Sequence, residues 1–523
     1  MKKTSYNFLQ RPVETAIVLM GIAAIVLFFR LGSTPIYILD EAKNAQCARE
    51  MMQHNDWIVP TFNNELRAHK PPLHYYFMRA SYKVFGITPF GARFPSALLG
   101  LLTIIFSWWF IKKFCTARIA LLALLTMVLS THFLFEFRMA VPDPYLIFFT
   151  TIGLFSFYAY IRERKTYWVI FSAVAMALAA LSKGPVALAL PGLAILAWLV
   201  LEKKIKMLLD WKLVMAAFVF LIVALPWYLL VHKATGGEFT RGFFLEHNIR
   251  RFNEPMEGHG GIFLLVPLFV FIGLLPMSVF LTGFIRRVKH FYPQPMVSFS
   301  IAISLVFILF FSFSGTKLPN YPMPCYPFLS LLIAYSMNNA IESPKGIKGP
   351  LIILFVFSLL LLAAAVIGFR LDPSLNPKAA WALLFLLPVV GIGVAIFRSG
   401  KNSVYALIAV VVCYCVFNLV GLGILYPAIY RDNPVSATIH HVRASGDIFA
   451  YQIYNPAFNF YIDQPIKVLT SKTELEKAIH NSAGAIIITR ENYLPELEGL
   501  PLQIIQKYKD PLESPTTVIL KYR

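Results

Sequence analysis

Two adjacent carboxylates near the N-terminus are the first groups in this chain that could do chemistry. Asp40 and Glu41 directly follow an apolar stretch, in the segment Ile-Leu-Asp-Glu-Ala-Lys-Asn. Acidic residues beside a hydrocarbon layer are unfavourable unless they are paired or hydrated, so they are functional candidates by default. The plainer alternatives are a solvated loop charge or, at Asp40, an N-terminal helix cap. We predict Asp40 and Glu41 as catalytic residues and Lys43 as a contact to the substrate.

A second segment, Arg67-Ala-His69-Lys70-Pro71-Pro72, places a cation where a helix is expected to begin. The two prolines end the preceding segment and suit the first turn of a helix. Lys70 then stands beside a helix N-terminus, where backbone N–H groups and the helix dipole favour an anion. A phosphate fits this position better than a metal does, and a lysine that reaches to lipid headgroups is the alternative. We predict that Lys70 binds a substrate phosphate and that His69 contacts another part of the substrate.

Four further polar segments border the later apolar stretches. Their lysines and arginines recur at the ends of these stretches, whereas carboxylates are few there. Cations gathered at one membrane boundary are what a membrane-embedded phosphate ester needs for binding. The candidates are Asp143 as a catalytic residue, Lys183, His247, Arg251, Lys317 and Tyr321 as phosphate ligands, and Arg138 and His259 as contacts to other parts of the substrates.

Other familiar chemistry finds no support in the sequence. The chain has no P-loop, no Gly-x-Ser-x-Gly elbow, no His-Glu-x-x-His motif and no long dinucleotide fingerprint. His247 and His259 lie in one loop, so a zinc site stays open. We assign no certain cofactor and leave a divalent metal open. Without a soluble nucleotide-binding domain, a transferase would most simply use a lipid-linked donor from the outer side of the bilayer.

The composition identifies the elements that must position these residues. Of the 523 residues, 58% are hydrophobic and only 14% are charged, whereas a soluble domain carries about 25% charge. This excludes an ordinary soluble enzyme, a disordered chain and a disulfide scaffold. The net charge of +20 is explained by basic cytoplasmic loops rather than by nucleic acid, which we do not expect as a partner. We predict a polytopic α-helical membrane protein.

Thirteen apolar stretches are long enough to be candidate spans, since a transmembrane helix needs about 20 residues. Basic residues concentrate in alternate loops, which places the N-terminus and these loops in the cytoplasm. The odd number of spans then puts the C-terminus on the other side. The candidate spans are roughly 14–30, 93–111, 119–135, 144–161, 167–181, 184–201, 212–231, 262–284, 296–313, 322–338, 349–368, 379–397 and 403–425.

The long polar segments all fall on the external side. They are a first external loop at about 31–92, a second at about 232–261, and a terminal domain at about 431–523 that follows a transmembrane domain at 1–430. The terminal part alternates short strands with helices, which predicts a small α/β domain. It has too few convergent acids, histidines or Gly-rich turns for an active site, so we expect it to cap the site or dock a partner.

Taken in order, these motifs resemble the integral-membrane glycosyltransferases of the C-type fold. Their order and spacing look most like the aminoarabinose (4-amino-4-deoxy-L-arabinose) transferase of lipid A and, more distantly, the protein O-mannosyltransferases. The resemblance covers roughly 14–430. The motifs that carry it are Asp40-Glu41, Lys70-Pro-Pro-Leu, Arg138…Pro-Asp143-Pro, Ser182-Lys183-Gly-Pro, Glu246-His247-Asn…Arg251-Phe and Lys317-Leu-Pro-x-Tyr321.

The resemblance implies a sugar carried on undecaprenyl phosphate and transferred at the periplasmic face of a bacterial inner membrane. It implies that Asp40 lies near the reaction centre and Lys70 beside the donor phosphate. It further implies phosphate binding by Arg251, His247 and Lys317, and a second acidic position at Asp143, held by Arg138. One residue departs from the pattern: the lipid A enzymes typically show Glu-Lys-Pro-Pro, whereas this chain has His69 in place of the glutamate. This departure weakens the inference of aminoarabinose and of a metal at this position, and the identity of the sugar stays open.

The acceptor and two rival functions stay open at this point. Lipid A phosphate is the expected acceptor, with another envelope acceptor or a secreted protein as the alternative. A flippase or transporter of lipid-linked sugars would explain many spans and phosphate-binding lysines. It explains the large external segments less well, because transporters generally bind substrate at the bilayer midplane and often show repeated halves.

Overall fold

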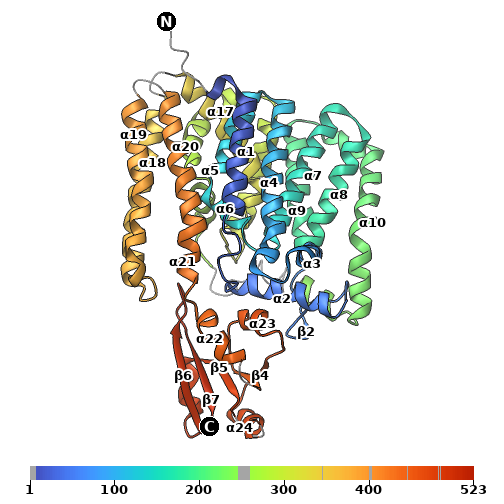
Figure 1. Cartoon of the computed structure of the whole chain (residues 1–523). Helices are drawn as coiled ribbons and strands as arrows, with labels where there is room; N and C mark the ends of the chain where they lie inside the picture. The colour runs from blue at the N-terminus through green and yellow to red at the C-terminus, as the bar shows by residue number, and fades with distance from the viewer. Residues whose placement is uncertain are drawn as a thin grey trace.

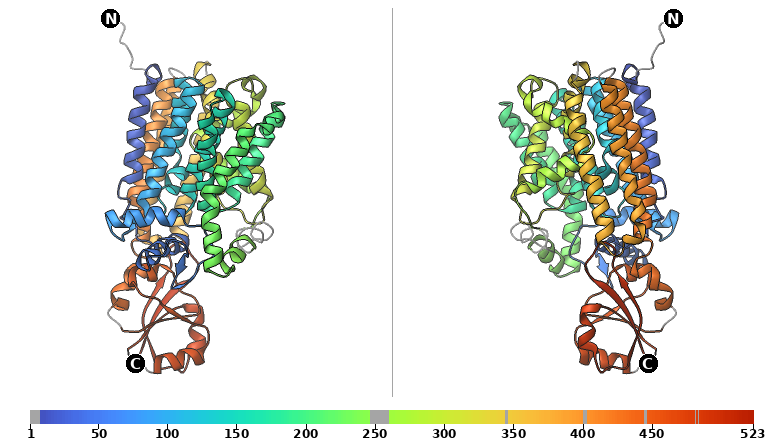
Figure 2. Two further views of the ribbon diagram at one scale, coloured as in Figure 1. Left: turned by 90° about the vertical axis from the view of Figure 1, so that its right-hand side faces the viewer. Right: turned by 90° about the vertical axis from the view of Figure 1, so that its left-hand side faces the viewer.

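The computed structural model describes residues 8–245, 260–343, 346–399, 403–443, 446–480, 482 and 484–523. Long helices run side by side in one bundle, and a small sheet domain formed by the C-terminal residues lies beyond one end of it (Figure 1). Figure 2 shows the same separation from two further sides. The predicted fold class, a polytopic helical membrane protein with a small C-terminal α/β domain, is confirmed.

The helices of the bundle account for all thirteen predicted stretches, but the count of thirteen spans is not confirmed. Among the described residues, seven helices are long and apolar enough to cross a membrane. An eighth candidate, Leu265–Gly273 with Met277–Arg286, is bent by 114°. The main helices are α1 (Pro12–Phe28), α4 (Pro89–Phe114), α5 (Ala117–Leu129), α6 (Thr131–Glu136), α7 (Asp143–Glu163), α8 (Thr166–Lys183), α9 (Val186–Leu201), α10 (Trp211–Ala234), α13 (Leu265–Gly273), α14 (Leu281–Arg286), α16 (Val297–Phe313), α17 (Tyr326–Glu342), α18 (Lys348–Leu371), η6 (Asn376–Phe385), α19 (Leu386–Ser399), α20 (Ser403–Val420), η7 (Gly421–Leu425) and α21 (Tyr426–Tyr430).

A serine breaks one of the predicted stretches into two helices. Ser130 ends α5 and caps α6, since its hydroxyl accepts a hydrogen bond from the Phe133 N–H at 3.1 Å. The same hydroxyl donates to the carbonyl of Gly273 in α13 at 2.5 Å. A short polar side chain at an N-cap satisfies a backbone donor that the helix itself leaves open. The chain thus bends between α5 and α6 at Ser130, whose backbone is extended rather than helical.

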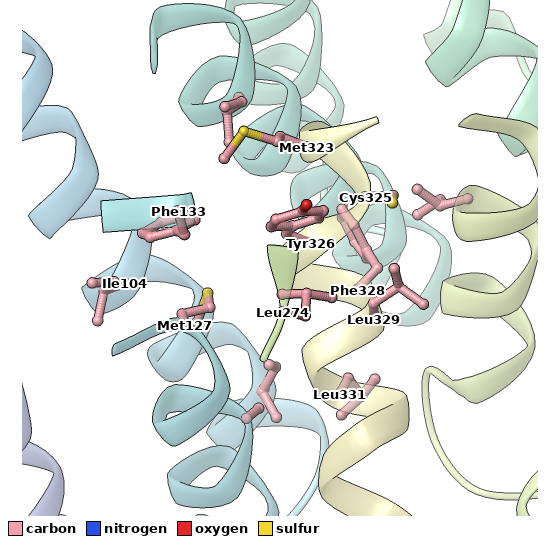
Figure 3. Packing of buried hydrophobic residues seen from close by; sticks show 14 of the residues in the cluster. Ile104, Met127, Phe133, Leu274, Met323, Cys325, Tyr326, Phe328, Leu329 and Leu331 are labelled. Atoms are coloured by element: carbon pink, nitrogen blue, oxygen red, sulfur yellow. The ribbon is translucent and has the colours of Figure 1, made fainter. Parts of the chain in front are cut away.

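Large side chains pack the centre of the bundle around this bend. Figure 3 shows Tyr326 and Phe328 of α17 in the same buried cluster as Phe133 of α6 and Met127 of α5. A Cβ atom on Gly273 would lie 2.1 Å from the Tyr326 hydroxyl oxygen. Only glycine permits this close approach, which fixes α13 against α17.

The first external segment forms a layer between the bundle and the sheet domain (Figure 1). It contains two helices and a small antiparallel hairpin in which Thr61 pairs with Leu66. The predicted proline stop is confirmed, because the second helix begins at Leu73, directly after Pro72. The elements are α2 (Leu39–Gln53), β1 (Thr61–Phe62), β2 (Glu65–Leu66) and α3 (Leu73–Phe85).

The C-terminal domain is a five-stranded mixed sheet in the order β4-β3-β5-β7-β6. β3 pairs in parallel with β4 and β5, whereas β7 pairs antiparallel with β5 and β6. The predicted alternation of short strands with helices is confirmed in this region. The elements are α22 (Pro434–Arg443), β3 (Ile448–Tyr451), α23 (Ala457–Ile462), β4 (Lys467–Leu469), α24 (Lys472–His480), β5 (Ile486–Arg490), η8 (Glu491–Leu497), β6 (Leu502–Lys509) and β7 (Thr516–Tyr522).

Buried polar contacts join this domain to the first external segment. The Asn63 side chain donates to the carbonyl of Ile466 at 2.9 Å and accepts from the Ile466 N–H at 2.7 Å. The Arg49 guanidinium donates to the carbonyl of Phe460 at 2.8 Å. Apolar side chains of both parts also share one buried cluster. The domain therefore braces α2, the helix whose first turn carries Asp40.

Candidate functional site

Glu41 is fully engaged in a buried ion pair with Arg93 of α4. Arg93 Nε and Nη2 lie 2.7 and 2.6 Å from the two carboxylate oxygens, and these side chains are only 2% and 1% exposed. The Ala140 N–H donates to Glu41 Oε1 at 2.9 Å. Arg93 also donates to the carbonyl of Thr34 at 2.6 Å. Glu41 thus ties α2, α4 and the segment before α7 together.

Asp40 has a different environment although it is the adjacent residue. It lies exposed in the first turn of α2, where the helix dipole favours a negative charge. Ile38 occupies the N-cap position, so the interpretation of Asp40 as a helix cap is wrong. Arg67 and Glu136 lie within electrostatic reach of Asp40. An exposed carboxylate at a helix start, next to buried charges, is suited to contact a bound substrate.

Lys70 lies at the start of α3, as predicted. It is half-buried, whereas the neighbouring His69 is exposed. His74, in the first turn of α3, is fully buried, and burial together with the cations Arg67 and Lys70 holds the pKa of His74 well below its usual range. His74 is therefore neutral at pH 7, and the positive charge at this helix start comes from Lys70 and Arg67.

Buried polar side chains surround this helix start. The side-chain oxygen of Asn44 on α2 lies 3.4 Å from His74 Nε2 and 3.4 Å from the Tyr75 hydroxyl. Arg67 is 4% exposed, and within the described part of the chain its Nε and Nη1 atoms have no hydrogen-bond partner. Sequence reasoning did not select Asn44, Arg67 or His74. Arg67 and His74 flank the Lys70 motif, but their burial is visible only in the structure.

A second cluster forms where α7, α8 and the segment after α16 meet. Lys183 Nζ lies 2.5 Å from the Asp143 carboxylate and 4.8 Å from the centre of the Tyr321 ring. The Glu136 carboxyl lies in the electrostatic neighbourhood of both charged groups. The structure thus brings together three residues that the sequence analysis selected separately.

The predicted pairing of Arg138 with Asp143 is wrong. Arg138 donates instead to the main-chain carbonyls of Val26 at 2.5 Å, of Phe29 at 3.1 Å and of Leu422 at 3.2 Å. The last carbonyls of a helix have no partner within the helix, and the guanidinium supplies donors for the end of α1. Arg138 is a structural clamp between α1 and η7.

The remaining candidates lie in several places. Lys317 is 8% exposed and donates to the carbonyl of Ser314 at 2.6 Å, in the segment between α16 and α17. Lys43 is half-buried on α2, one turn after Asp40. The predicted phosphate and sugar contacts His247, Arg251 and His259 lie outside the described residues. Within the described ranges, no group of three or more His, Cys, Asp or Glu side chains could hold a metal ion.

Aromatic contacts connect the elements that carry the two clusters. Tyr145, two residues after Asp143, has its ring centre 6.1 Å from that of His74 and 5.4 Å from that of Phe77. α3 therefore packs against the start of α7, and the Lys70 and Lys183 sides adjoin. The layer that contains α2 and α3 lies at the end of the bundle next to the C-terminal domain (Figure 1).

Comparison with known proteins supports the resemblance seen in the sequence. Residues 17–235 match the family described as dolichyl-phosphate-mannose-protein mannosyltransferase. An uncharacterised protein of Aquifex aeolicus (strain VF5) is 31% identical over 333 residues, which cover 63% of this chain and 75% of that protein. The undecaprenyl phosphate-alpha-4-amino-4-deoxy-L-arabinose arabinosyl transferase of Yersinia pestis (strain Pestoides F) is 29% identical, with 73% of this chain and 72% of that protein covered.

The fold is shared along nearly the whole chain. The crystal structure of ArnT from Cupriavidus metallidurans bound to undecaprenyl phosphate superposes with a TM-score of 0.82 and 21% identity, over 96% of this chain and 97% of that one. The helical bundle, the external layer and the C-terminal domain therefore occur together in a solved relative. On the family match, the related sequences and the shared fold, this chain belongs to the integral-membrane glycosyltransferases of the C-type fold.

Proposed function

We propose that this glycosyltransferase moves a sugar from undecaprenyl phosphate to an acceptor at the external face of the membrane. The observation that carries the proposal is the convergence of Lys70, the Lys183–Tyr321 pair and the exposed carboxylate of Asp40 at one end of the bundle. Cations at a helix start suit the phosphate of a lipid-linked donor. The names of the Yersinia relative and of the Cupriavidus structure, both of which include undecaprenyl phosphate, support this donor.

In the proposed reaction, an acceptor oxygen attacks the anomeric carbon of the sugar while the bond from that carbon to the phosphate oxygen breaks. The polyprenyl phosphate leaves with the bonding electrons and gains negative charge. Lys70, Lys317 and Arg251 stabilise that charge, and each such donor is worth about 10²–10³ in rate. A single displacement inverts the anomeric centre.

Asp40 has a role that depends on the acceptor. If the acceptor is a hydroxyl group, Asp40 accepts its proton, a contribution of about 10²–10⁴ in rate. If the acceptor is a lipid A phosphate, it is already an anion, and Asp40 orients it or stabilises positive charge on the sugar ring. Asp143 holds Lys183 in place, and Glu41 acts as a positioning residue through Arg93.

We further propose lipid A as the acceptor and the bacterial inner membrane as the location. The N-terminus is then cytoplasmic and the C-terminal domain periplasmic, an orientation supported by the basic residues of alternate loops. A secreted protein is the second candidate acceptor, because the matched family model describes a protein mannosyltransferase.

Mass spectrometry of lipid A from cells with and without the gene tests this proposal. We expect a mass shift equal to one sugar, which Asp40→Asn and Lys70→Ala abolish. Lys83→Ala is the matched control, because Lys83 is exposed at the far end of the same helix. Identical lipid A spectra, with the donor shown to be present, would refute lipid A as the acceptor, and new sugar on secreted proteins would then establish the second candidate.

A further inference from the structure

Arg67 is a buried cation whose hydrogen-bonding capacity is only partly used by the described protein. It is 4% exposed, and within the described ranges Nε and Nη1 have no hydrogen-bond partner. The neighbouring Cys47 thiol is only a weak acceptor, and it donates its own hydrogen to the carbonyl of Thr61. A buried charged donor without an acceptor is strongly unfavourable. A bound ligand that supplies the acceptor would remove this penalty.

A backbone hydrogen bond fixes the position of Arg67, and neighbouring groups keep its guanidinium charged. Its N–H donates to the carbonyl of Pro60 at 2.9 Å, which fixes the residue after β2. Burial alone would lower the pKa of Arg67, but Tyr75, Cys47 and Asp40 raise it above its usual value, so the guanidinium remains charged. Asp40, the proposed centre of the reaction, is thus within electrostatic reach of Arg67.

Three polar side chains at this helix start, His74, Asn44 and Tyr75, are neutral and have hydrogen-bonding atoms suited to a sugar. His74 Nδ1 is buried and, among the described residues, has no hydrogen-bond partner. Asn44, 1% exposed, and Tyr75, 0% exposed, line the same helix start. Neutral donors and acceptors of this kind bind hydroxyl groups, whereas Arg67 requires an anion for a charge-assisted hydrogen bond.

We infer that the transferred sugar carries a carboxylate, as in a hexuronic acid, and that Arg67 binds it. The inference rests on the proposed function, because it assigns the sugar of the same lipid-linked donor. A neutral sugar would give Arg67 no charged partner. An amino sugar would place an ammonium group next to a buried guanidinium, and the two like charges would repel each other.

Binding of four synthetic short-chain ligands to the full chain in nanodiscs tests the inference. The ligands are bare polyprenyl phosphate and polyprenyl phosphates that carry a hexuronic acid, the matching neutral hexose or an amino-pentose. We expect the uronosyl donor to bind roughly 10- to 100-fold more tightly than the hexosyl donor, as for one charge-assisted hydrogen bond. Arg67→Gln is expected to bring this ratio close to one, and Arg67→Lys to retain part of it.

Arg79→Gln is the matched control for the loss of a buried arginine in the same external segment. Arg79 is 2% exposed and lies over the Trp57 ring at 3.7 Å, so its loss should leave the ratio unchanged. The ratio is internal to each variant and does not depend on how much protein is folded.

Three results would overturn the inference. The first is tighter binding of the hexosyl or amino-pentosyl donor to the wild type. The second is an equal loss of affinity for all four ligands in Arg67→Gln, which would show that Arg67 binds the donor phosphate rather than a sugar carboxylate. The third is no binding of any ligand, including bare polyprenyl phosphate, which would refute the proposed function together with the inference.

Discussion

Separate replacement of the adjacent carboxylates Asp40 and Glu41 should distinguish a residue that acts in the reaction from one that stabilises the fold around the site. Asp40→Asn is expected to lower turnover and leave thermal stability nearly unchanged, because Asp40 is exposed. Glu41→Gln is expected to lower stability first. It removes the carboxylate charge that pairs with Arg93 at 2.7 and 2.6 Å, and the two side chains are only 2% and 1% exposed.

The magnitude for Glu41→Gln follows from this burial. Removal of one partner of a buried ion pair leaves an uncompensated charge and costs about 3–5 kcal/mol. Glutamine keeps the shape of the side chain and one acceptor oxygen, so the lower end, about 3 kcal/mol, is expected. A change of 1 kcal/mol shifts Tm by roughly 2–4 °C in a domain of 150–250 residues and by less in a longer chain. The expected loss is therefore several degrees.

The assay is tryptophan fluorescence during heating of the wild type and both variants in nanodiscs, with sugar transfer measured on the same samples. If Glu41→Gln keeps the wild-type Tm but loses sugar transfer, the structural role is refuted and Glu41 takes part in the chemistry instead. A Tm loss in Asp40→Asn as large as that in Glu41→Gln would show that Asp40 also supports the fold.

Three other changes test separate parts of the account. Asp143→Asn should leave the Lys183 cation without its carboxylate partner at 2.5 Å and should lower turnover about as much as Lys183→Met. The double variant should then be no less active than either single variant, whereas additive losses in kcat/KM would show that the two residues act independently. The pKa of His74 is held below its usual value of 6.5, so the contribution of His74 to stability is complete above pH 6.5 and is lost as the pH falls below that value. Between pH 7 and 5, Tm should therefore decline less in His74→Asn than in the wild type. Parallel curves of Tm against pH for the two proteins would contradict this. Asn63→Ala should cut the contacts that hold the C-terminal domain on the hairpin and expose the segment before β3 to protease; an unchanged digestion pattern would argue against the brace.

Local patterns predicted the C-terminal domain well. Each strand there is a short run of β-branched and aromatic residues bounded by turn residues, and each helix has its own amphipathic period. The start of α3 was equally clear, because two prolines fix it. In the bundle, apolar residues lie on every side of most helices, so the sequence did not show the bend at Ser130 or the 114° bend after Gly273.

The sequence analysis selected individual residues of the candidate site but not the contacts that they make with one another. Asp143 and Lys183 are 40 residues apart, and their contact depends on the packing of α7 on α8. Arg138 is closer to Asp143 in sequence, yet its guanidinium donates to main-chain carbonyls at the end of α1 instead. Arg67 was passed over because sequence alone does not distinguish a solvated arginine from a buried one.

The central claim is that the donor phosphate binds at the Lys70 end of the bundle, beside Asp40. The most direct test is a cryo-EM structure of the full chain in nanodiscs with undecaprenyl phosphate. We expect the phosphate at hydrogen-bond distance, about 2.7–3.2 Å, from Lys70 Nζ, and its loss in Lys70→Ala. A phosphate at the bilayer midplane or at the opposite end of the bundle, with Lys70 unoccupied, would contradict the account.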